Sequence, residues 1–199
     1  MEALSYLNPG DPRLEEVIST QDRAHRLAVT WLYELPFGRG KAIGNVSNRI
    51  VSYAISGWQL QGIYTLQSGA PLGFGNVFFY GNLKDIRLPS DQRNVNRWFN
   101  TDAGFERDTQ KQPGSNLRTL SSRFGGIRAD GPNNWDVSMI KNTQITERTK
   151  LQFRAEAINF MNHPQFTAPN TTPSSTAFGT VTGEFAWPRV IQFGMKVLF

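Results

Sequence analysis

The chain contains no cysteine and only two histidines among its 199 residues. Without thiols it has no disulfide framework, no thiolate zinc site and no cysteine nucleophile. It also lacks any run of 18 or more apolar residues, which excludes a transmembrane helix. The chain contains 39% hydrophobic and 12% aromatic residues. This is enough to form a packed structure, so we do not expect the chain to be disordered.

Charge is also sparse, at 19% of residues, and it is scattered. Lys and Arg outnumber Asp and Glu by 21 to 16, which gives a formal net charge of +5. No block of five or six like charges occurs, so we expect a mildly basic surface and no nucleic-acid partner. A charge-free stretch runs from Ile50 to Leu83, although it is rich in Ser, Gln and Gly.

No group of residues predicts catalysis. His25 and His163 stand alone in the sequence, and a lone loop histidine is usually structural. The stretch Gly38-Arg39-Gly40-Lys41 is not a phosphate-binding loop, because Leu35 and Ala42 occupy the positions that need Gly and Ser or Thr. We therefore expect no catalytic residue, no metal ligand, no cofactor and no enzymatic activity.

Five segments show apolar residues at every second position, at 25–35, 57–68, 134–144, 150–159 and 188–199, although the intervening residues of 25–35 are a mixed set. Each has about the length that a tilted strand needs to cross a bilayer. Their apolar faces contain no Asp, Glu, Lys or Arg. These faces are Leu27, Val29, Trp31, Tyr33 and Leu35; Trp58, Leu60, Gly62, Tyr64 and Leu66; Trp135, Val137 and Met139; Leu151, Phe153, Ala155 and Ala157; and Ile191, Phe193, Met195, Val197 and Phe199.

Alternation alone leaves two interpretations open. A soluble antiparallel sheet, as in a β-sandwich binding module, buries one face in a core and exposes the other to water. A transmembrane β-barrel exposes its apolar face to lipid and its polar face to the lumen. The second interpretation makes Gln59, Gln61, Arg154 and Glu156 lumen-facing, with Arg154 and Glu156 close enough to pair.

Loop lengths and aromatic positions favour the barrel. The 145–149 turn is short, whereas the 71–133 and 160–187 connections are long, as the periplasmic and extracellular connections of outer-membrane barrels are. The 36–56 connection is longer than a typical periplasmic turn. In this topology Trp135 and Trp187 belong to an outer aromatic girdle, and Tyr33, Trp58 and Phe199 to an inner one.

Several segments resemble a known family. The last eleven residues, 189–199, look like the final strand of a bacterial outer-membrane protein, which ends in Phe. The segments 58–71, Leu35-Pro36-Phe37-Gly38-Arg39-Gly40, Arg97-Trp98-Phe99-Asn100 and 151–164 resemble the TonB-dependent outer-membrane transporters, in their Oar-like branch with a carboxypeptidase-regulatory-like domain. The resemblance covers about residues 20–199.

The resemblance implies a location in the bacterial outer membrane, a larger barrel with a plug in its lumen, and coupling to a TonB complex. It also implies that the barrel-assembly machinery reads Ile191, Phe193, Met195, Val197 and Phe199. The implied partners are outer-membrane lipid, that machinery, the rest of the barrel with its plug, and the TonB complex.

Five strands are too few to close a barrel, and the first residues, 1–6, do not resemble a signal peptide. We therefore expect an all-β chain that forms part of an antiparallel transmembrane barrel, with 1–21 a loop or partial N-terminal segment and 22–199 the C-terminal barrel segment. Such a chain would not bind and take up substrate without the rest of the transporter.

Overall fold

The computed structural model describes residues 16–38, 40–44, 48–112 and 120–199, and the chain divides into two compact units. The first, which we call the sheet unit, comprises Arg26–Leu66, Asn133–Pro164 and Ala186–Phe199. The second, which we call the loop unit, comprises Met1–His25, Gln67–Pro132 and Gln165–Phe185. The predicted boundary between residues 21 and 22 stays a prediction.

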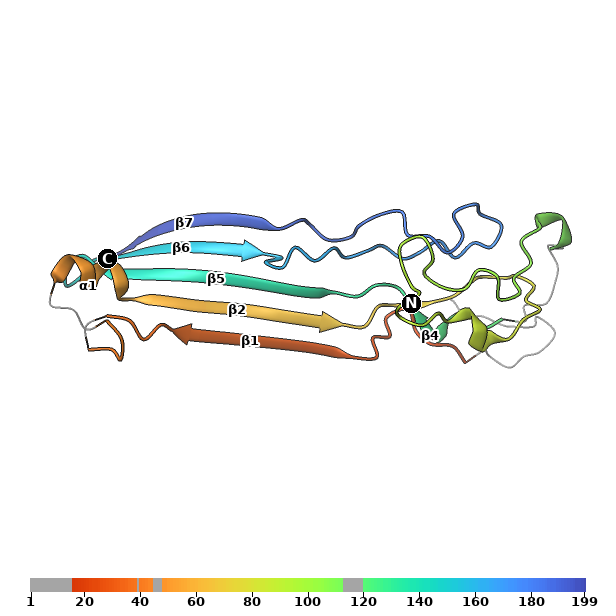
Figure 1. Ribbon diagram of the computed structural model, residues 1–199, viewed down its shortest axis with the longest axis horizontal. Helices are drawn as coiled ribbons and strands as arrows, with labels where there is room; N and C mark the ends of the chain where they lie inside the picture. Colours follow the sequence, from red (N-terminus) through yellow and green to blue (C-terminus); the bar gives the residue numbers. More distant parts are fainter. Residues whose placement is uncertain (1–15, 39, 45–47, 113–119) are drawn as a thin grey trace. The chain divides into compact units, whose positions relative to one another are not determined.

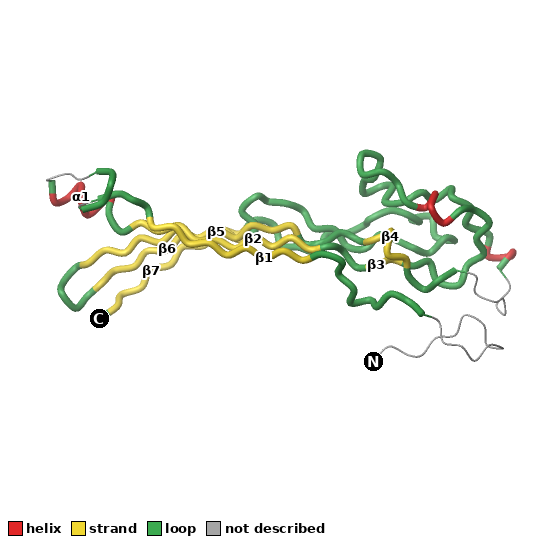
Figure 2. Tube along the Cα trace, turned by 90° about the horizontal axis from the view of Figure 1, so that it is seen from below, coloured by secondary structure: helices red, strands yellow, loops and turns green. Residues whose placement is uncertain are grey.

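Five antiparallel strands form one sheet in the order β1-β2-β5-β6-β7 (Figure 1). Their bounds are Arg26–Glu34 for β1, Trp58–Gln67 for β2, Asn133–Gln144 for β5, Lys150–Ile158 for β6 and Val190–Leu198 for β7. Each of the five predicted strands is confirmed with nearly the predicted ends. The strands lie in a single layer (Figure 2), and the sheet is open: among the described residues no strand pairs with the outer edge of β1 or of β7, which we call the free edges.

Residues with special backbone geometry end the strands. After β1, Pro36 has no N–H to donate, and Gly38 has φ +113°, where a Cβ would collide with Ser56. The β5–β6 turn closes through Thr146, whose Oγ1 accepts from the N–H of Thr149 at 3.0 Å. After β6, Asn159 adopts φ +51°, a left-handed conformation that Asn tolerates better than most residues.

A short helix, α1 (Arg49–Ile55), lies in the connection between β1 and β2. Asn48 caps its N-terminus, because its Oδ1 accepts from the N–H groups of Ile50 at 2.9 Å and Val51 at 3.3 Å. The helix ends before Gly57, which has φ +73°. Part of the unusual length of this connection is therefore helix.

The register aligns the apolar faces of the strands. Residues directly opposite each other in an antiparallel pair project to the same side of the sheet. One continuous row consists of Leu60 on β2, Met139 on β5, Ala155 on β6 and Phe193 on β7. On β1, Trp31 lies over Gly62, where a Cβ would be only 2.7 Å from the indole ring. The apolar residues predicted strand by strand thus share one face of the sheet.

The loop unit has little regular structure but a well-defined core. Its elements are β3 (Pro71–Leu72), β4 (Phe124–Arg128) and the 3-10 helices η1 (Leu83–Ile86) and η2 (Thr109–Lys111), with β3 paired to β4. The aromatic rings of Phe74, Phe99, Phe105 and Phe178 pack at centroid distances of 4.6 to 6.1 Å. The remaining buried core residues are Leu72, Val77, Ile86, Trp98, Ala103, Leu120 and Ile127.

Backbone hydrogen bonds join the two long connections within this unit. The N–H of Trp98 donates to the carbonyl of Gly179 at 2.9 Å, and that of Val181 donates to Val95 at 2.7 Å. The segments between β2 and β5 and between β6 and β7 therefore fold together. The 71–133 segment, which has no periodicity in the sequence, forms part of a packed unit.

Candidate functional site

The apolar face of the sheet has exposed side chains on β1, β2, β5 and β7, and its side chains on β6 are half-buried. On β7, Phe193 is 72% exposed and Met195 71% exposed, and Leu27, Val29, Leu66 and Ile191 are exposed on the same face. A contiguous apolar face of this kind on a water-soluble protein would be an interaction surface. In lipid it is the ordinary outer surface of a strand.

Aromatic side chains lie near both ends of the strands. Leu35, just after Tyr33, donates its N–H to Trp58 at 3.0 Å, so Tyr33 and Trp58 mark the same end. Trp135 lies near the other end, stacked on Tyr64 with ring centroids 4.4 Å apart. Trp187 precedes β7 and is 81% exposed. Tyr33 and Trp135 are also exposed, as residues of an interfacial belt should be.

Lys141 is an exception on the apolar face that the sequence pattern did not single out. It lies opposite Trp58 in the register, and its ammonium is 5.4 Å from the centroid of that indole ring. Its Nζ donates to the carbonyl of Tyr53 at 2.6 Å and to the carbonyl of Ser56, at the C-terminal end of α1. A cation at a helix C-terminus is favourable, so α1 provides the polar contacts that this charge needs near the membrane boundary.

The opposite face carries the polar side chains predicted to face a lumen. Gln59 and Gln61 on β2 lie opposite Ile140 and Ser138 on β5. Arg154 on β6 lies opposite the same Ile140, so it is on the same face of the sheet. The Arg154 guanidinium is 3.4 Å from Glu156 Oε1. These four predicted residues share one face, opposite to the apolar one.

Glu156 is the centre of the polar contacts on this face. Its Oε2 accepts from Gln192 Nε2 at 2.6 Å, and its Oε1 accepts from Ser138 Oγ at 3.3 Å. Three neighbouring strands, β5, β6 and β7, thus contribute side chains to one carboxylate. A carboxylate with two hydrogen bonds and an ion pair is well accommodated on a wet but partly enclosed surface.

A second polar cluster holds the sheet at the end where β6 stops. Asp136 Oδ1 accepts from the N–H of Asn159 and from Asn134 Nδ2, both at 2.9 Å. The buried Asn159 side chain donates to the carbonyls of His163 and Trp187, each at 3.2 Å. His163 takes part through its backbone, which agrees with a structural role. Sequence reasoning did not identify this cluster, although Asn159 and His163 lie in a segment that carries the family resemblance.

Among the described residues, no group of three or more His, Cys, Asp or Glu side chains is placed to hold a metal ion. No helix in the described part of the chain is both long and apolar enough to cross a membrane.

A single antiparallel sheet of membrane-crossing length, apolar and uncovered on one side and polar on the other, is the wall of a transmembrane β-barrel. Sequence comparison agrees: the model of the family "Outer membrane beta barrel domain" matches residues 2–192. The chain belongs to this family and is a protein of the bacterial outer membrane. No curated protein and no solved structure matches it significantly.

This membership decides between the two interpretations of the alternation. The soluble β-sandwich is wrong, because the apolar face is uncovered and faces lipid. The barrel itself is not closed in this structure. The residues Ile191, Phe193, Met195 and Val197 alternate along the exposed face of β7, with Phe199 just beyond its end. The recognition of these residues by the barrel-assembly machinery stays a prediction.

Proposed function

We propose that the chain is part of the barrel of a TonB-dependent outer-membrane transporter or receptor of the Oar-like branch, acting in substrate binding and uptake. The observation that carries the proposal is the combination of an open membrane-crossing sheet with a separate folded unit built from its long connections. A transporter needs both a wall in lipid and an outer surface that meets its substrate.

The open sheet supports a larger barrel. The free edges of β1 and β7 carry backbone N–H and C=O groups, and each such group left unpaired in lipid is costly. Closed single-chain outer-membrane barrels have about 8 strands or more. Five strands therefore require further strands on both sides, and a TonB-dependent barrel of about 22 strands provides them.

The topology of the connections supports an extracellular surface formed by the two long connections. In the antiparallel order, the chain leaves the same end of the sheet after β2 and after β6. These are the two long connections, and they fold together in the loop unit. The short β5–β6 turn is at the opposite end, which is the asymmetry of outer-membrane barrels.

The partners follow from the same proposal. Lipid contacts the apolar face, the assembly machinery inserts the barrel, a plug occupies the lumen beside Glu156 and Arg154, and the TonB complex supplies energy through the plug. The role is binding and transport, and we propose no catalytic activity, cofactor or nucleic-acid partner.

The proposal is tested on the gene product in its native membrane. The outer-membrane fraction is solubilised in mild detergent and passed over the immobilised periplasmic domain of TonB, with a resin that carries an unrelated periplasmic domain as the control. We expect selective retention on the TonB resin. A protein that migrates as a heat-modifiable outer-membrane barrel but is never retained would keep its family and overturn the transporter assignment.

A further inference from the structure

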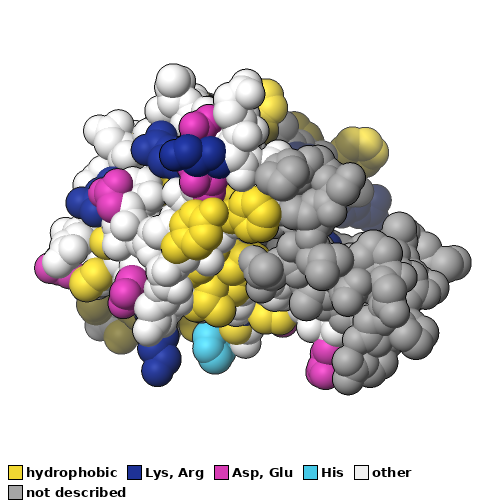
Figure 3. All heavy atoms as spheres, turned by 90° about the vertical axis from the view of Figure 1, so that its right-hand side faces the viewer, with side chains coloured by type: hydrophobic (Ala, Val, Ile, Leu, Met, Phe, Trp, Pro, Cys, Tyr) yellow, Lys and Arg dark blue, Asp and Glu magenta, His cyan; other side chains and the backbone are white. Residues whose placement is uncertain are grey.

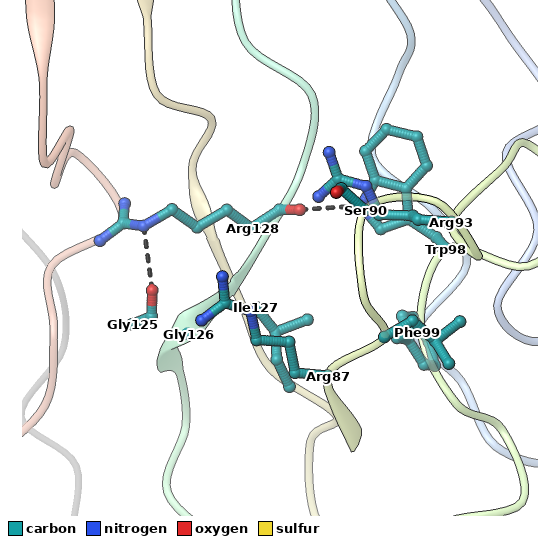
Figure 4. A pocket seen from close by; sticks show the side chains of 10 residues that line it. Arg87, Ser90, Arg93, Trp98, Phe99, Gly125, Gly126, Ile127 and Arg128 are labelled. Carbon is teal, nitrogen blue, oxygen red and sulfur yellow. Dashed lines mark hydrogen bonds between the residues drawn. The ribbon is translucent and has the colours of Figure 1, made fainter. Parts of the chain in front are cut away.

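The loop unit contains a pocket of about 300 Å³ between the segment that follows η1 and strand β4 (Figure 4). Three arginines line it, Arg87, Arg93 and Arg128, together with Ser90. No Asp or Glu is among the described residues that line it. Neither the predicted membrane surface nor the lumen-facing residues include this pocket.

The floor of the pocket is rigid and apolar. Phe99 is fully buried, and Ile127 and Trp98 are also part of the core of the loop unit. The indole Nε1 of Trp98 donates to the backbone carbonyl of Arg128 at 2.8 Å, a contact drawn in Figure 4. Because the ring is both packed and hydrogen-bonded, groups that rest on it are held in place.

The three arginines differ in how their guanidinium groups are used. Arg128 is occupied within the fold, since it pairs with Asp22 at 2.5 Å and donates to the carbonyl of Gly125 at 3.0 Å. Arg93 lies over the Trp98 ring, 4.6 Å from its centroid, and a guanidinium stacked on a ring directs its N–H groups outward from its edges. Arg87 is exposed and forms no ion pair with any residue that the structure describes.

Other charged side chains of the loop unit contrast with this pocket. On the face of the unit drawn in Figure 3, basic and acidic side chains lie close to one another, so their charges offset locally. Arg97, for example, is 3.6 Å from Asp102. The pocket instead combines a hydroxyl donor, Ser90, with two guanidinium groups that have no carboxylate partner in the described part of the chain.

We propose that this pocket binds a small oxyanion, a compact molecule bearing a carboxylate or phosphate group. The planar guanidinium presents paired N–H donors that match both groups, and Arg87 and Arg93 are the residues that would supply them. Arg93 is preorganised on Trp98, which lowers the entropy cost of binding. The volume of about 300 Å³ is at the lower end of small-molecule sites, which suits a compact ligand.

The proposal does not depend on transport, because it concerns equilibrium binding by the loop unit. The test uses the protein purified from its native membrane in detergent, titrated calorimetrically with inorganic pyrophosphate and with citrate in low-salt buffer. The variants are Arg87→Gln and Arg93→Gln, with Arg148→Gln as a charge-matched control in the β5–β6 turn of the sheet unit. Each pocket variant should weaken binding about tenfold or more, and the control should not.

A fourth variant blocks the pocket without removing charge. A Cβ at Gly126 would meet no atom within 4 Å, so Gly126→Leu should fold normally and place its side chain at the pocket wall. We expect it to abolish binding of the larger probe, citrate. Far- and near-UV circular dichroism checks the fold of each variant, and Arg87→Gln is decisive because Arg87 is exposed and forms no ion pair with the described residues.

Binding by the unaltered protein that is lost in Arg87→Gln and kept in Arg148→Gln supports the site. Two results would overturn it: no heat with either probe at millimolar concentration, or equal weakening in Arg87→Gln and Arg148→Gln, which indicates general electrostatic attraction. Neither result bears on retention by TonB, so failure of this proposal is distinguishable from failure of the proposed function.

Discussion

The sheet unit and the loop unit arrange their aromatic residues in opposite ways. In the sheet unit Phe193 is 72% exposed, and in the loop unit Phe99 is fully buried. The sheet unit alternates polar and apolar residues strand by strand, whereas the loop unit has an apolar core without any period. The difference indicates two solvents: lipid surrounds the first unit and water surrounds the second.

The comparison predicts that the loop unit depends on its core as a soluble domain does. Phe99→Ala should cost the loop unit about 3–5 kcal/mol, because it removes a fully buried ring from the cluster with Phe74 and Phe178. Limited proteolysis should then cut within 67–132 while the strands stay protected. Tyr80→Ala, which changes a 72% exposed ring, is the control and should leave the cleavage rate unchanged. Equal protection in both variants would show that the unit has no cooperative core.

The stability cost of an introduced charge in the sheet unit should depend on which face of the sheet carries it. Phe193→Arg places a cation on the apolar face and should cost about 2–4 kcal/mol if that residue is near the bilayer midplane. Gln192→Arg, one residue earlier, places the same charge beside Glu156 on the polar face and should be nearly neutral. Urea unfolding in phospholipid vesicles measures both. A similar loss in the two variants would contradict the assignment of the faces.

The end of β6 offers a test of a polar contact within the sheet unit. Asn159→Ala should cost about 1–3 kcal/mol, because the carbonyls of His163 and Trp187 lose their donor. Asn159→Gly keeps the positive φ accessible and isolates the side-chain effect. The temperature at which heat-modifiability is lost should fall in both variants, and further in Asn159→Ala. Unchanged temperatures would mean that this cluster does not hold the strand ends.

A pair of glycines tests the packing of β1 against β2. Gly62→Ala should cost about 1–3 kcal/mol, since its Cβ would press on the Trp31 ring and the carbonyl of Asp136. At Gly194 a Cβ meets nothing within 4 Å, so Gly194→Ala is the matched control and should be neutral. Urea unfolding in vesicles compares the two. Equal stability would show that Trp31 does not rest against β2.

The sequence predicts the sheet unit far better than the loop unit, for a physical reason. A strand imposes a period of two, so Leu60 or Phe193 reveals its face from its neighbours alone. The core of the loop unit joins Phe74, Phe99 and Phe178 across more than 100 residues of chain without any local period, so only tertiary structure reveals it. Lys141 was missed for a similar reason, because its contacts lie on α1 and not on its own strand. Arg87 and Arg93 also come to line one pocket only in the folded chain.

The most direct test of the lipid-facing surface uses the absence of cysteine from these 199 residues, which makes an introduced thiol unique within them. Single cysteines at consecutive positions of β7, from Gln192 to Val197, are labelled with an environment-sensitive fluorophore, and the protein is reconstituted in vesicles with brominated lipid chains. We expect strong quenching at 193, 195 and 197 and weak quenching at 192, 194 and 196. Uniform quenching along the strand, or the opposite alternation, would contradict the claim that this face of the sheet contacts lipid.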